Sequence, residues 1–67
     1  MNMYLVTIHA TCTTTIGNEP MTIKHKFDGL NKSKIKALRL AEKRLTKWAD
    51  NPYIESFDID DITVKEM

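Results

Sequence analysis

The longest periodic pattern of apolar and polar positions runs from Asn31 to Asp50. Its apolar residues recur at spacings of three and four, which at about 100° per residue places them on one stripe of a helix. Asn31 is a suitable N-cap, because its side chain can accept a free N–H group of the first turn. The pattern ends before Pro52, since the residue before a proline avoids helical geometry. The predicted apolar stripe consists of Ile35, Leu38, Ala41, Leu45, Trp48 and Ala49.

Two stretches before this helix alternate between apolar and polar residues, as strands with one buried face do. In the first, from Met3 to Thr15, even-numbered residues are mostly apolar, while His9 and several threonines occupy odd positions. In the second, from Met21 to Asp28, the odd-numbered residues form the less polar face. The turn-forming residues from Gly17 to Pro20 lie between them, so the pair predicts a β-hairpin.

The chain after the helix predicts a third strand with an irregularity in its middle. Its apolar residues are odd-numbered at Phe57 and Ile59 but even-numbered at Ile62 and Val64. Because successive side chains point to opposite faces, these four share a face only if the strand contains one extra residue. We therefore predict a β-bulge at Asp60–Asp61.

The order strand, strand, helix, strand predicts an α+β fold of ββαβ type. The third strand runs antiparallel to the first, so placing it beside the first gives a three-stranded antiparallel sheet of order 2-1-3. The helix packs on one face of this sheet, and we expect Trp48 to lie in the core near the third strand. A chain of 67 residues forms one small domain, predicted to span residues 1–67.

The composition is that of an ordinary folded domain, with 42% hydrophobic and 28% charged residues. No apolar run approaches the roughly 18 residues needed to cross a bilayer. The only cysteine, Cys12, excludes an intrachain disulfide and fits a reducing compartment. We therefore expect a cytoplasmic protein that does not engage membranes.

The net charge of +1 conceals a strong asymmetry along the chain. Nine of the ten Lys/Arg residues lie from Lys24 to Lys47 against two acids, whereas six acids and one lysine follow from Asp50 onward. Five of these cations recur at spacings of three and four opposite the apolar stripe, with Leu40 beside them. We predict that this row binds a partner. Its residues are Lys32, Lys36, Arg39, Leu40, Lys43 and Lys47.

Three interpretations of this basic row remain open at the level of sequence. It can be a solvated face, a surface for an acidic protein, or a surface for nucleic-acid phosphates. Few donors suited to base edges accompany the lysines, and no aromatic residues alternate with them. We predict a non-catalytic regulatory or inhibitory protein that binds an acidic protein surface, with a nucleic-acid-binding module as the alternative.

Cys12 and His25 are the only nucleophile–base pair that the sequence offers. They lie opposite each other if Ile16 pairs with Met21, but a thiolate–imidazole pair also needs a group that orients the histidine. No such third residue is recognisable, so a Cys/His enzyme ranks third. His9 and His25 fall on opposite faces, and no spacing matches zinc ligands. We therefore predict no catalysis, no metal, no cofactor and no small-molecule substrate.

The limited size of the core and the threonine-rich open face together predict self-association. Chains this short bury a small share of their surface, and oligomerisation is one way to increase it. We expect a homodimer that forms through a sheet edge or through the open sheet face.

Overall fold

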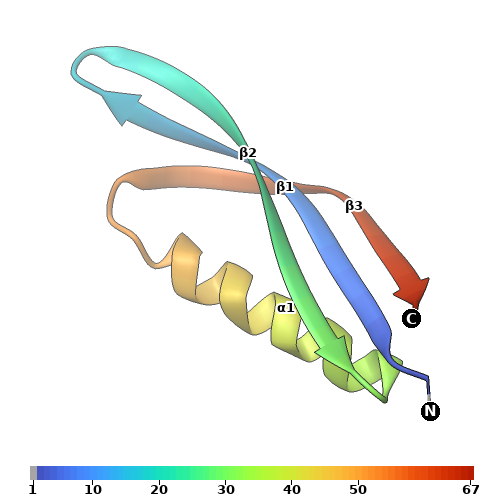
Figure 1. The fold of residues 1–67 in the computed structure, drawn as a ribbon. Coiled ribbons are helices and arrows are strands. Elements are labelled where there is room, and N and C mark those ends of the chain that lie inside the picture. Colours follow the sequence, from blue (N-terminus) through green and yellow to red (C-terminus); the bar gives the residue numbers. More distant parts are fainter. Residues whose placement is uncertain (1) are drawn as a thin grey trace.

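The computed structural model describes residues 2–67, and it contains one sheet and one helix (Figure 1). The strands are β1 (Tyr4–Ile16), β2 (Glu19–Asn31) and β3 (Ile54–Glu66), and the helix is α1 (Lys34–Ala49). The sheet has the order β2-β1-β3, and β1 pairs with both neighbours in antiparallel fashion. The helix lies along one face, which confirms the predicted ββαβ architecture.

The hairpin between β1 and β2 is tighter than the sequence suggested. Gly17 has a φ of 66° and no other residue from 2 to 67 has a positive φ, which matches a two-residue turn of type II′ with glycine first. Ile16 therefore pairs with Glu19, and the register with Ile16 opposite Met21 is wrong. Pro20 can belong to β2 because this strand is at the edge of the sheet, where a missing N–H is tolerated.

The bulge predicted in β3 is confirmed. His9 pairs with Asp61 and Ala10 pairs with Ile59, so Asp60 is the extra residue. A second register shift, which the sequence analysis did not anticipate, leaves Glu55 unpaired farther along the strand. The shift at Asp60 keeps the apolar residues on either side of it on the same face of the sheet.

The helix begins two residues later than predicted, because β2 continues to Asn31. Ser33 is the N-cap, and its hydroxyl accepts a hydrogen bond from the backbone N–H of Lys36 at 3.4 Å. The Asn31 side chain instead accepts from the Ser33 N–H at 3.0 Å, a local bond of the kind that shapes turns. Asn31 thus forms the turn that leads into the helix rather than the cap itself.

Small residues allow α1 to approach the sheet closely. A Cβ atom at Gly29 of β2 would lie 1.9 Å from the carbonyl oxygen of Ala37 and 2.8 Å from the nitrogen of Ala41. Both alanines are completely buried. The core under this contact is a single cluster drawn from β1, β2 and α1. Its members are Val6, Ile8, Ala10, Phe27, Ala37, Ala41 and Leu45.

The helix covers only part of its face of the sheet. Its 16 residues span about 24 Å, whereas each 13-residue strand spans about 43 Å. It packs mainly on β2 and β1, so the tip of the hairpin extends beyond it (Figure 1). The helix therefore leaves most of β3 uncovered, and the four apolar residues that share its inner face, Phe57, Ile59, Ile62 and Val64, are exposed.

Trp48 packs against β2 rather than near β3. Its ring centroid lies 4.7 Å from that of His25 and 5.1 Å from that of Phe27. The side chain is half-buried at the edge of the core cluster. Trp48 therefore belongs to the packing surface of α1, as predicted, but it contacts the other edge strand.

We expect Trp48→Ala to lower the free energy of unfolding by about 3 kcal/mol, the lower end for removing a core tryptophan, because the ring is half-buried. The measurement is urea denaturation followed by circular dichroism. Tyr53→Ala is the matched control, since Tyr53 is 75% exposed and its loss should change stability by about 0.5 kcal/mol or less. Equal losses from the two variants would contradict the packing described for Trp48.

We expect Gly29→Ala to cost more than about 3 kcal/mol, because the added methyl group meets backbone atoms of α1 that cannot rotate away. The comparison is Gly17→Ala, where the new methyl group enters open space and the cost is only the positive φ, about 1–2 kcal/mol. Denaturation of both variants tests this order. A smaller loss at Gly29 would show that α1 is free to move away from β2.

Candidate partner-binding surface

Four of the predicted cations lie on the outer side of α1 and are exposed. Lys36, Arg39, Lys43 and Lys47 follow one another at spacings of three and four. From first to last they extend over about 17 Å of helix, and we call these four residues the basic ridge. Lys32 is also exposed but precedes the N-cap, so it belongs to the connection between β2 and α1 and is not on the helix.

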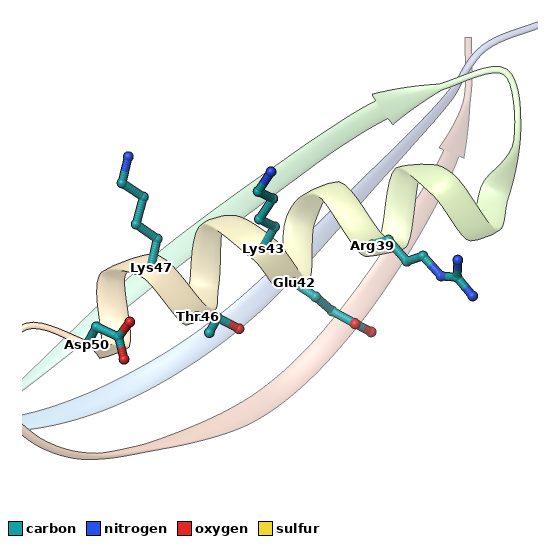
Figure 2. A pocket seen from close by; sticks show the side chains of 6 residues that line it. All are labelled: Arg39, Glu42, Lys43, Thr46, Lys47 and Asp50. Atoms are coloured by element: carbon teal, nitrogen blue, oxygen red, sulfur yellow. The ribbon is translucent and has the colours of Figure 1, made fainter.

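On the side of α1 that faces β2, the charged residues of the ridge are all positive. Figure 2 shows Lys43 and Lys47 extending from α1 in the same direction, while Glu42 extends to the other side. Between these side chains lies an open depression of about 560 Å³. Asp50, the C-cap residue, follows Lys47 by three residues and marks the end of the ridge. An approaching anionic surface thus meets three full turns of positive charge first.

Leu40 adds an apolar element to this surface. It is 40% exposed on a helix whose buried residues are Ala37, Ala41 and Leu45. Together with Lys36, Arg39, Lys43 and Asn31 it lines a depression of about 280 Å³. An aliphatic side chain surrounded by cations can contribute buried area to a contact whose rim is charged.

Arg44 is an exposed cation that the sequence analysis left out of the ridge. It follows Leu40 by four residues, so the two lie on the same flank of α1. The spacing of four from Leu40 is the sequence signal that identifies this position. Including Arg44 widens the positive surface on the β2 side of the helix.

The positive charge begins at the end of the helix where it is least favourable. A helix N-terminus carries partial positive charge, and acids in the first turn stabilise it. The first turn of α1 contains no acid, and it contains Lys34 and Lys36. Only Lys47, in the last turn, is favourably placed with respect to the helix dipole. Lys36, the first residue of the ridge, therefore acts against the stability of the helix.

Cys12 and His25 do not form the cross-strand pair considered from the sequence. Cys12 pairs with Ile23, and His25 pairs with Ala10 two positions away, because the hairpin turn is shorter than expected. The Cys12 side chain is 1% exposed, and His25 stacks on Phe27 with ring centroids 5.7 Å apart. Both side chains thus have packing roles, and the absence of catalysis stays a prediction.

The open face of the sheet carries threonines that bind neighbouring acids. Thr7 donates a hydrogen bond to Asp28 at 2.8 Å, and Thr11 donates to Asp60 of β3. Among residues 2–67, no group of three or more His, Cys, Asp or Glu side chains could hold a metal ion. α1, the single helix of the described chain, is too short and too polar to cross a membrane.

Comparison of the chain with protein-family models, with curated proteins and with solved structures gave no match in any of the three.

Proposed function

We propose that this is a non-catalytic regulatory or inhibitory protein that binds an acidic surface of a macromolecular partner. The contact surface is the basic ridge with Leu40, extended by Lys32 before the helix and Arg44 beside it. The single observation that carries the proposal is a continuous, exposed row of cations with an exposed aliphatic residue among them. Such a row accelerates encounter with an acidic surface and favours it over a basic one.

The charge at the helix start argues against a purely solubilising role for the ridge. Acidic residues in the first turn would keep the protein soluble and would also stabilise the helix. Lys36, the first residue of the ridge, stands there instead, at a cost of about 0.3–1 kcal/mol in the field of the helix dipole. Binding to an anionic partner offsets this cost, whereas solubility alone does not require it.

Leu40 favours a protein partner over nucleic acid. A phosphate backbone offers charge but little apolar surface, so an exposed leucine contributes little there. Arg39 is the one arginine among the four ridge residues, and arginine is the commonest residue that reads base edges. Nucleic acid remains the alternative partner, and it is an outcome of the experiments below.

We expect Lys36→Glu, Arg39→Glu and Lys43→Glu together to abolish capture of the partner from a lysate of the native host while leaving the fold intact. Exposed substitutions of this kind change stability by about 0.5 kcal/mol or less each. The matched control reverses Lys24, Lys26 and Lys65, which are exposed on the strands, and so gives the same net charge. Capture is measured by affinity purification with and without nuclease treatment.

Three results distinguish the interpretations. Loss of capture in the ridge variant alone, with no effect of nuclease, supports the proposal. Loss of capture on nuclease treatment shows that nucleic acid is the ligand. Full capture by the folded ridge variant shows that the ridge is a solubility feature, and it contradicts the proposal.

We expect Leu40→Ala to weaken binding of the captured protein about five- to tenfold, because the truncated side chain buries less apolar area, at about 1 kcal/mol for a contact residue. The measurement is calorimetry with the purified partner at several salt concentrations. Because the lost contact is apolar, the ratio of the wild-type affinity to the Leu40→Ala affinity should hardly change with salt concentration. An unchanged affinity would place Leu40 outside the interface.

A further inference from the structure

A continuous apolar surface lies beside α1, on the same face of the sheet. Four of its residues come from β3 and two from the distal part of β2. Each of the six exposes between 37% and 52% of its surface. We call it the β3 strip. Its residues are Met21, Ile23, Phe57, Ile59, Ile62 and Val64.

The strip follows from the register of the sheet. Ile23 and Phe57 both pair with Cys12, one from each side, so they flank this buried residue on the same face of the sheet. Ile59 pairs with Ala10 and Ile62 with Ile8, on the same face as the core. The bulge at Asp60 is what keeps Ile59 and Ile62 on one side. The surface is therefore unbroken along β3 and contains no charged residue.

A groove joins the strip to the helix. Ile35 and Leu38 of α1 face Ile62 and Val64 of β3 across a depression of about 140 Å³, with Val6 and Lys34 also in its lining. The Lys34 amine lies over the Tyr4 ring, 5.2 Å from its centroid. Ile35 is 64% exposed, which is unusual for a residue of the apolar stripe of a helix. The space above β3 thus has apolar walls on two sides, and nothing within residues 2–67 fills it.

The area of this surface matches what a pair of identical subunits needs. A large aliphatic or aromatic residue presents on the order of 200 Å², so the six strip residues and Ile35 together expose roughly 600 Å² per chain. Two chains that face each other would bury at most roughly 1,200 Å², and a specific interface needs about 1,000 Å². A chain of 67 residues also gains most from additional burial.

The distribution of charge favours packing face to face over pairing edge to edge. Asp58 and Asp61 of β3 pair with Thr11 and His9, so they belong to the opposite face of the sheet. Pairing of two β3 edges would bring these acidic rows next to each other, which is unfavourable. Stacking of two β3 strips keeps Asp58 and Asp61 on the outside. Glu66 pairs with Tyr4 and so lies on the face of the strip, but at the very end of β3, and the basic ridge on the other flank of α1 stays exposed.

We propose that the protein forms a symmetric homodimer in which the β3 strip of one chain packs on the β3 strip of the other. The same patch is used twice, as a two-fold axis requires. The two sheets lie about 10 Å apart, the usual spacing of stacked sheets, and Ile35 and Leu38 of each helix border the partner's β3. This interface differs from the sheet edge and the threonine-rich face considered from the sequence.

Sedimentation of the wild-type chain is the first test. With an area near the lower end of specific interfaces, we expect a monomer–dimer equilibrium with a dissociation constant in the micromolar range. A folded chain that stays monomeric up to high micromolar concentration overturns the proposal. If the chain forms a dimer, substitutions on β3 locate the interface between the two chains.

Ile62→Lys should shift the equilibrium to the monomer, because the charge would be buried against the partner's strip. The control is Thr63→Lys, an exposed change at the next residue of β3, which points to the other face and should leave the dimer unchanged. Dimerisation that persists in folded Ile62→Lys, or that is lost equally in both variants, overturns the proposal.

Contacts between chains can also be measured in the wild-type dimer, so the test does not depend on a variant that folds. In dimers mixed from labelled and unlabelled chains, isotope-filtered NMR detects contacts between chains alone. We expect such contacts among the methyl groups of Ile59, Ile62 and Val64. Contacts between chains that involve instead the methyl groups of Thr7, Thr11 or Thr63 place the interface on the open face and contradict the proposal.

Discussion

The close contact between Gly29 of β2 and the backbone of α1 determines how the rest of the molecule is arranged. Because Gly29, Ala37 and Ala41 carry almost no side chain, the helix axis can approach the sheet only over this strand and its neighbour. A helix held there cannot also cover β3, since two packed helices would be needed to cover a three-stranded sheet fully. The exposed apolar strip and the outward direction of the ridge both follow from this one contact.

The same placement gives the two flanks of α1 different characters. On the β2 side lie the basic ridge, Leu40 and Arg44, whereas Ile35 and Leu38 border the apolar residues of β3 on the other side. A contact on one flank therefore need not obstruct a contact on the other. Partner binding and self-association use separate residues, so a variant that abolishes one process is a fair control for the other.

How much of this could be predicted depends on what a residue pattern reports. The bulge at Asp60 followed from the change in parity between Ile59 and Ile62, because alternation in a strand is strict. The helix start did not follow from the residue pattern, since Asn31 and Ser33 are both good caps. The hairpin register did not follow either, since Gly17–Pro20 accommodates turns of two or four residues. The four residues of the ridge lie on the helix where their spacing predicts them. Lys32, the fifth cation of the predicted row, precedes the N-cap.

The exposed strip marks the limit of such reasoning. Alternating apolar residues on β3 indicate that one side of the strand is apolar, but burial depends on which element covers that side. The lateral position of α1 decides this, and it is set by Gly29 on another strand, which reads as a turn residue in the sequence. The alternation of the four β3 residues therefore does not distinguish a buried face from an exposed one. A chain with so small a core gains stability when such residues are covered. No other part of the described chain covers them, so the covering surface has to belong to another molecule. A second copy of the chain is always present at the same concentration.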